Sequence, residues 1–192
     1  MLAAGLYPVP EGHLAAVVTY LEATTVPAGA RALPNGVRLD RWTPDLTAYR
    51  ALFRRIGTPW LWSSRLRQAD DEVEAVLNDP GYETYVLRED GAMLGMLDLD
   101  LREPDIAWIA FLGLVPEVTG RGFGTALMAE AAARALARAR CVRLHTCTLD
   151  DPRALGFYRS QGFVPYARAV EILPDPRGTH LPEDAAPALP RL

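Results

Sequence analysis

Hydrophobic positions change their spacing near residue 80, and this change divides the predicted elements into two groups. Before it, the pattern predicts a strand at 17–25 and helices at 44–56 and 70–78, separated by proline and glycine. After it, short apolar runs alternate with turn residues, which indicates strands. The elements expected there are strands at 82–87, 93–101 and 106–115, a helix at 122–140, a strand at 142–149, a short helix at 152–161 and a strand at 163–172.

The links between these elements predict how the strands pair. The three strands after residue 80 are joined by links too short for a crossover, so they should pair antiparallel. The long helix that follows Val115 can supply a right-handed crossover to a parallel strand near Val142. The sequence therefore predicts an α+β fold with a mixed, mostly antiparallel central sheet flanked by helices. We expect one domain over 1–172 and a proline-rich C-terminal tail over 173–192.

Composition and charge exclude several classes of partner. The chain has 192 residues, of which 49% are hydrophobic, and a net charge of −4, so nothing global attracts nucleic acid or an anionic membrane. No apolar run is long enough to cross a bilayer and no signal peptide is evident, which predicts a cytoplasmic protein without a membrane partner. Cys141 and Cys147 share one predicted strand and lie too far apart to bridge, so we expect buried thiols and no metal site.

The most informative segment is FLGLVPEVTGRGFGTAL, residues 111–127, where an apolar strand runs through a turn into a helix. Gly120, Gly122 and Gly124 remove side chains from this turn, so backbone N–H groups at the positive end of the helix can approach a ligand. A phosphate or pyrophosphate fits such a site. A nucleotide-triphosphate loop would need a lysine here, and a dinucleotide fingerprint would need GxGxxG after the first strand, so both alternatives are weaker.

Two motifs resemble the GNAT superfamily of N-acetyltransferases. The first is the family's cofactor turn, Gln/Arg-x-x-Gly-x-Gly/Ala, which residues 119–124 match with Thr119 in place of the long polar residue. The second is the segment Asn-x-x-Ala-x-x-Phe-Tyr-x-x-x-Gly-Phe one strand later. It is matched by Asp151, in place of Asn, and by Ala154, Phe157, Tyr158, Gly162 and Phe163. The resemblance covers residues 80–170 well, and the earlier part only in its order of elements.

The resemblance implies a fold, a cofactor and a reaction. The fold would have a V-shaped acetyl-CoA cleft between two splayed parallel strands. The reaction would transfer acetyl from acetyl-CoA to a primary amine by direct attack in a ternary complex. A backbone N–H near the end of the cofactor strand, that of Val115, would donate to the thioester oxygen. The implied cofactor-binding residues are Leu114, Val115, Thr119, Gly120, Arg121, Gly122, Gly124, Thr125 and Asp151.

Three groups of side chains are candidates for chemistry. Tyr158 is the expected acid for the departing thiolate, although an aromatic at helical spacing can also simply pack. Asp98 is the first candidate base and Glu117 the second; either can equally be a solvated surface carboxylate. The acceptor wall is expected to contain Trp60, Trp62 and Arg65. His145, between apolar neighbours, is expected to be structural.

Other functions remain open. The acceptor is a small-molecule or peptide amine that the sequence does not specify, and a homodimer is one expectation because family members often pair. A catalytically inactive acyl-CoA sensor of the same fold is the alternative function. Nucleotide binding by a small α/β domain is the third.

Overall fold

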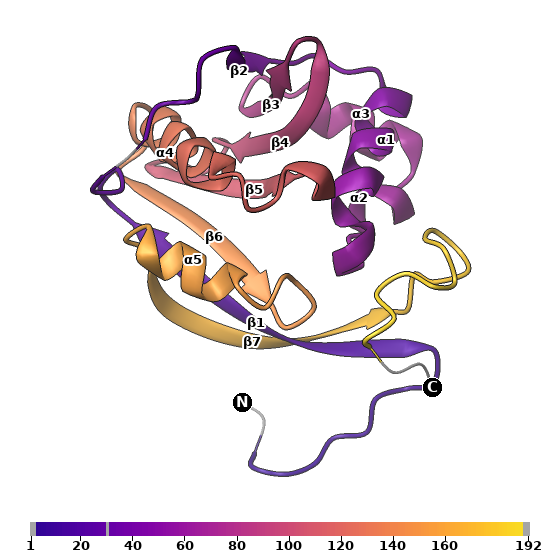
Figure 1. Ribbon diagram of the computed structural model, residues 1–192. Helices are drawn as coiled ribbons and strands as arrows, with labels where there is room; N and C mark the ends of the chain where they lie inside the picture. Colours follow the sequence, from indigo (N-terminus) through magenta and orange to yellow (C-terminus); the bar gives the residue numbers. More distant parts are fainter. Residues whose placement is uncertain (1–2, 30, 190–192) are drawn as a thin grey trace.

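Seven strands form one sheet with helices packed against it (Figure 1). The computed structural model describes residues 3–29 and 31–189. The strands are β1 His13–Ala23, β2 Val37–Arg41, β3 Tyr82–Glu89, β4 Ala92–Asp100, β5 Ile106–Leu114, β6 Cys141–Cys147 and β7 Val164–Pro174. They lie in the order β2-β3-β4-β5-β6-β1-β7, antiparallel except for β5 and β6. The expected α+β class is confirmed.

The helices cover both faces of this sheet. They are α1 Leu46–Gly57, α2 Ser64–Arg67, α3 Asp70–Leu77, α4 Phe123–Leu136 and α5 Ala154–Ser160, with short 3-10 turns at Thr58–Trp60 and Pro116–Val118. Consecutive residues of β5 show which helix covers which face. A Cβ on Gly113 would meet Ile56 of α1, whereas a Cβ on Gly124 of α4 would lie 3.9 Å from Leu114. Neighbouring strand residues point to opposite faces, so α1 and α4 lie on opposite sides.

Strands β5 and β6 pair over only part of their length. Their parallel register runs from Ile106 opposite Cys141 to Trp108 opposite Arg143. Both strands then continue without pairing to each other, β5 to Leu114 and β6 to Cys147. The divergence is visible in Figure 1, where β5 and β6 separate toward the side of α2 and the C-terminal segment. The expected pair of splayed parallel strands is therefore present.

The helices nearest the site follow from their sequences. The side chain of Asp45 caps α1 by accepting the N–H of Ala48, and one face of that helix buries Tyr49 and Phe53. Helix α4 is rich in alanine and buries most of its length. Such small side chains allow a helix to lie close to a sheet, so the start of α4 is held beside the end of β5.

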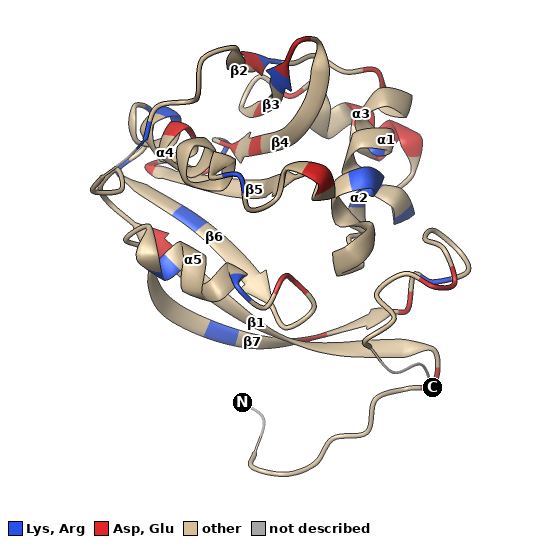
Figure 2. Ribbon diagram, in the orientation of Figure 1, with Lys and Arg blue, Asp and Glu red and all other residues tan. Residues whose placement is uncertain are grey.

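Two features of the sheet were not predicted. Strand β2 pairs with β3 at the edge, and only its Val37 and Leu39 are buried among charged neighbours. Strand β1 lies between β6 and β7, so the first strand of the chain pairs with the last one. Basic and acidic residues are interspersed over helices and strands rather than gathered on one element (Figure 2).

The C-terminal segment is more ordered than a simple surface tail. Strand β7 continues to Pro174, two residues beyond the expected end at 172. Arg177 pairs with Asp175 at 2.6 Å and donates from Nη1 to the carbonyl of Leu189 at 3.0 Å. Leu181 is buried in the core. This segment, expected only as a proline-rich tail, therefore contributes to the core. Within the described ranges, no helix is long and apolar enough to cross a bilayer.

Candidate active site

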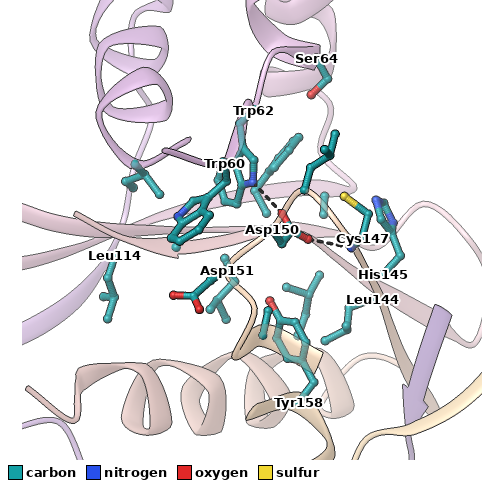
Figure 3. A pocket seen from close by; sticks show the side chains of 18 of the residues that line it. Trp60, Trp62, Ser64, Leu114, Leu144, His145, Cys147, Asp150, Asp151 and Tyr158 are labelled. Atoms are coloured by element: carbon teal, nitrogen blue, oxygen red, sulfur yellow. Dashed lines mark hydrogen bonds between the residues drawn. The ribbon is translucent and has the colours of Figure 1, made fainter. Parts of the chain in front are cut away.

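A cavity of about 890 Å³ opens where β5 and β6 diverge. One end is lined by the start of α4, and the other by the segment Trp60–Gln68 that links α1 to α3. Between them, the ends of β5 and β6 and the first residues of α5 form the walls. Figure 3 shows Leu114 and Trp60 on one side of this space and Asp151 and Tyr158 facing them. The cavity therefore lies between the two halves of the sheet.

Backbone amides dominate the end of the cavity beside α4. Gly120 and Gly122 both have φ of +85°, and Gly122 is the N-cap of the helix. A Cβ on either glycine would meet no atom within 4 Å, so the turn faces open space. The first N–H groups of α4 have no partner inside the helix, and they carry its partial positive charge. This geometry fits a phosphate or diphosphate of a ligand in the cavity.

Tyr158 lines the middle of the cavity. It is held on α5, where its ring packs against Phe157 and Phe163. Burial, reinforced by the nearby charge of Asp150, holds the pKa of Tyr158 well above its ordinary value. Figure 3 shows the phenol oxygen directed into the space between the walls. The hydroxyl therefore stays protonated over the whole physiological range and is able to donate.

Asp150 connects the two walls. It follows β6, and its Oδ2 accepts the hydroxyl of Thr146 at 2.7 Å and the N–H of Cys147 at 2.9 Å. Its Oδ1 accepts the indole N–H of Trp62 at 3.2 Å from the opposite side (Figure 3). Asp150 is thus a fixed carboxylate that lines the cavity.

A cluster of aromatic and charged residues forms the other end. Trp60, Trp62 and Arg65 all line the cavity, so the structure brings the expected acceptor-wall residues together. Trp62 packs against Phe111 with ring centroids 5.5 Å apart. The guanidinium carbon of Arg65 lies 5.4 Å from the centroid of the same Phe111 ring. An elongated ligand would therefore meet amides at one end and aromatic and charged side chains at the other.

A sequence model described as the acetyltransferase (GNAT) family matches residues 46–163. The chain belongs to this family. Solved structures similar to it include a GCN5-related N-acetyltransferase from Kribbella flavida, with a TM-score of 0.58 and 18% identity over 87% of this chain and 61% of that one. A putative GNAT-family acetyltransferase from Novosphingobium aromaticivorans has a TM-score of 0.57 and 20% identity over 85% of this chain and 67% of that one.

A third similar structure is an aminoglycoside acetyltransferase from an uncultured soil metagenomic sample, in complex with sisomicin. Its TM-score is 0.54, with 19% identity over 66% of this chain and 88% of that one. At these identities the likeness shows the GNAT fold alone. This chain also spans less than two thirds of the Kribbella protein. No curated protein matches it by sequence.

Most of the expected cofactor residues of this GNAT domain line the cavity, namely Leu114, Thr119, Gly120, Gly122, Gly124, Thr125 and Asp151. Arg121 and Val115 do not. The Arg121 guanidinium lies 3.8 Å from Glu89 and over the ring of Phe123. Val115 is fully buried. The side chain of Asp151 pairs with Arg153, which keeps the pKa of that carboxyl below its ordinary range.

The expectation that the Val115 N–H faces the thioester needs correction. This N–H donates to the carbonyl of Leu94 at 2.9 Å, so it is directed at β4. In an antiparallel ladder, successive residues direct their N–H groups to opposite sides of the strand. The N–H of Leu114 is therefore the one directed away from β4, toward the gap between β5 and β6.

The two carboxylates expected as bases do not line the cavity. Asp98 is fully buried on β4, where its Oδ2 accepts the hydroxyls of Tyr49 at 2.7 Å and Tyr82 at 2.9 Å. Burial raises the pKa of Asp98 to about 6, although these hydroxyls oppose the shift. Glu117 is exposed, and a backbone hydrogen bond, followed by the ion pair with Arg55 at 3.1 Å, lowers its pKa. Neither carboxylate contacts the cavity directly.

The sequence reasoning missed Asp150. A signal was present, because two adjacent acidic residues follow the predicted strand 142–149, but only the second belongs to the family motif. His145 and Cys147 also line the cavity. Burial raises the pKa of the Cys147 thiol to about 11, which keeps it protonated and unreactive at neutral pH. No group of three or more potential metal ligands occurs among residues 3–29 and 31–189.

Proposed function

We propose that this chain transfers the acetyl group of acetyl-CoA to a primary amine by direct attack in a ternary complex. The observation that carries the proposal is the arrangement of one cavity between β5 and β6. At one end, Gly120 and Gly122 leave backbone N–H groups exposed to the cavity. Protonated Tyr158 lies between this end and the expected acceptor wall. Membership of the GNAT family supports the reaction class.

The start of α4 would hold the cofactor. The N–H groups around Gly120 and Gly122 would bind the diphosphate of coenzyme A, and Thr119 and Thr125 lie beside them in the cavity wall. The Leu114 N–H, directed toward the gap, would donate to the thioester oxygen as negative charge develops there. Acetyl-CoA itself supplies the activated acetyl group.

Tyr158 would donate to the departing sulfur. Its raised pKa means that the phenol keeps its proton in the resting enzyme and is available as a donor. A thiol is a stronger acid than this phenol, so Tyr158 would stabilise the sulfur through its hydrogen bond as negative charge develops there, and the proton would move to the sulfur only as Tyr158 regains one from solvent. Tyr158 is therefore the expected catalytic acid.

Asp150 is the carboxylate best placed to receive the amine. A primary alkylamine is mostly protonated at neutral pH, so it must lose a proton before it attacks. Asp150 lines the cavity and is fixed by three hydrogen bonds. We propose that it binds the ammonium group and accepts its proton directly or through water. For Asp98 or Glu117 to act as the base, water would have to carry the proton to them.

Release of free thiol from acetyl-CoA tests the proposal. Purified protein would be assayed against classes of amine, including amino acids, polyamines, aminoglycosides and peptides. The chain contains no lysine, so released thiol cannot come from acetylation of its own lysine side chains. Amine-dependent release supports the transferase. Tight CoA binding without release for any amine would instead support the acyl-CoA sensor.

A further inference from the structure

The acceptor end of the cavity contains an arginine, Arg65, that is paired with no carboxylate of the described residues. Arg65 is 9% exposed and lines the cavity. Its Nη1 donates to Oε1 of Gln68 at 2.9 Å, and its Nη2 donates to the hydroxyl of Tyr82 at 3.0 Å. Both of these acceptors are neutral. Over residues 3–29 and 31–189, Arg65 forms no ion pair with an Asp or Glu.

A second buried arginine shows what a purely structural arrangement looks like in this fold. Arg177 is 5% exposed, and its guanidinium contacts the carboxylate of Asp175 at 2.6 Å. Its charge is therefore neutralised by direct contact. Burying a charge is unfavourable unless it is paired and hydrogen-bonded. Arg65 meets this condition only in part, and it differs from Arg177 in facing the cavity.

The surroundings of Arg65 fix its position and balance part of its charge. The Tyr82 hydroxyl that accepts from Arg65 also donates to Oδ2 of Asp98, so this counter-charge is one residue removed. Asp100 also lines the cavity and interacts with Arg65 at longer range, but its carboxylate is paired with Arg102. The guanidinium also packs over the rings of Phe111 and Tyr82, at 5.4 and 5.5 Å from their centroids. A guanidinium has five N–H donors. Two are used by Gln68 and Tyr82, and the buried Nε has no partner among the described residues.

An anionic site lies on the opposite wall of the same cavity. Phe111 contacts both Arg65 and Trp62, and the indole of Trp62 donates to Asp150. A cation and an anion thus face one space across a row of aromatic rings. A molecule that carries both an ammonium and a carboxylate complements this arrangement. A polycation such as an aminoglycoside would place positive charge against Arg65.

We propose that the acceptor amine carries a carboxylate, that Arg65 binds this carboxylate, and that Tyr82 is a positioning residue for Arg65. The inference rests on the proposed acetyl transfer and specifies its substrate class. A planar guanidinium with free N–H groups on both terminal nitrogens is suited to a carboxylate. Because Asp98 already balances part of the charge, a singly charged anion fits better than a phosphate.

The experiment compares matched acceptors on the wild-type chain. An ω-amino acid and its ω-amino amide have nearly the same amine but differ in the distant charge. Thiol release from acetyl-CoA is measured for both over a series of chain lengths. At the best length we expect the amino acid to have a kcat/KM higher by about 10- to 100-fold, carried mainly by KM.

Variants identify the residue that binds the carboxylate of the acceptor. Arg65→Gln should remove the preference for the amino acid, whereas the control Arg54→Gln, which removes an exposed arginine of α1 outside the cavity, should retain it. Tyr82→Phe keeps the ring and should reduce the preference by about 3- to 10-fold, through a higher KM for the amino acid. A thermal melt of each variant establishes that it is folded. Arg65→Lys should restore part of the preference.

Two results would overturn the inference while leaving acetyl transfer intact. One is equal or better turnover of the amide by the wild type at every chain length, which needs no variant. The other is an undiminished preference in folded Arg65→Gln. Absence of thiol release for all acceptors would instead defeat the proposed transferase. The carboxylate inference is then decided by calorimetric titration of the same ligand pair in the presence of CoA, where equal binding overturns it.

Discussion

The two ends of the cavity present different chemistry to a ligand. At the end beside α4, backbone N–H groups are exposed by Gly120 and Gly122, and their positions depend on backbone angles. At the acceptor end, Arg65 is held by Tyr82, which is held by Asp98. The first end depends on the absence of side chains and the second on a chain of side-chain contacts. Ligand binding at the end beside α4 should therefore depend little on pH. The acceptor end should depend on pH, because it contains Asp98, a buried carboxylate that titrates.

The largest effect is expected from placing a carboxylate in the amide end. Gly122→Asp adds a negative charge beside the amides that would bind diphosphate, and it forces a non-glycine residue into positive φ. Two like charges about 4 Å apart near a surface repel by about 4 kcal/mol, which predicts a loss of CoA affinity on the order of 1,000-fold. Calorimetric titration of CoA measures it.

Gly36 offers a matched control for that substitution. It has φ of +84° in the turn before β2, and a Cβ there would also meet no atom within 4 Å. Gly36→Asp should introduce the same backbone strain and lower the free energy of unfolding by about 1–2 kcal/mol, with no change in CoA affinity. If both variants weaken CoA binding equally, the α4 turn is not the diphosphate site.

Removal of the Tyr158 hydroxyl should give the next largest effect. Tyr158→Phe keeps the ring packing and removes the proton donor, so kcat should fall about 100-fold while CoA affinity is unchanged. The raised pKa of Tyr158 also predicts that the wild-type enzyme loses no activity from this group up to about pH 10. Steady-state rates over a pH series provide the measurement. An unchanged kcat in the variant would rule out Tyr158 as the acid.

Asp98 should make the stability of the acceptor half depend on pH. Its pKa is raised from 3.8 to about 6 in the folded chain, so between these values the folded state binds the extra proton. The contribution of Asp98 to the free energy of unfolding therefore increases by about 1–2 kcal/mol as pH falls from about 8 to about 5. The reason is that the ionised carboxylate is unfavourable in the buried site, and acidification neutralises it.

Asp98→Asn tests this dependence because it removes the titration while keeping an acceptor oxygen for Tyr49 and Tyr82. Denaturant unfolding would be measured at about pH 8 and about pH 5. The increase in the free energy of unfolding on acidification should be smaller in the variant than in the wild type, by about 1–2 kcal/mol. CoA affinity should stay the same in both proteins. A gain of equal size in both would assign the pH dependence to other groups.

The smallest effect concerns the contact between the two walls. Trp62→Phe removes the indole N–H that bonds Asp150 but keeps an aromatic ring against Phe111. Because this hydrogen bond positions Asp150 and does not itself contact the acceptor, we expect only part of its free energy in binding, a rise of about 3- to 10-fold in KM for the acceptor and none in KM for acetyl-CoA. Trp42→Phe, outside the cavity, is the control. A rise in both KM values would indicate that the substitution disturbs the whole cavity rather than the position of Asp150 alone.

Local features of the chain were predictable and long-range contacts were not. The glycine turn, the start of α4 and the position of Tyr158 follow from neighbouring residues, because backbone angles and helix ends are encoded locally. The Val115 prediction failed by one residue, since the direction of an N–H depends on the pairing of β5 with β4.

The acceptor end was less predictable because its partners are distant in sequence. Asp98 was predicted as the first candidate base or a solvated carboxylate, and its buried position could not be predicted because its partners are Tyr49 from α1 and Tyr82 from β3. Asp150 was missed because its role depends on Trp62, 88 positions earlier. Strand β2 was missed because three of its five residues are charged, which weakens its hydrophobic pattern.

The position of β1 has a consequence for how the protein assembles. Among the strands that the structure describes, β7 pairs only with β1, and β1 joins it to β6. During synthesis, β1 stays unpaired on that side until β7 has left the ribosome. The part of the cavity wall that β7 contributes, Glu171 and Leu173, therefore forms only after both β1 and β7 have been made. A deletion that removes residues 13–23 would leave both β6 and β7 without a neighbour there.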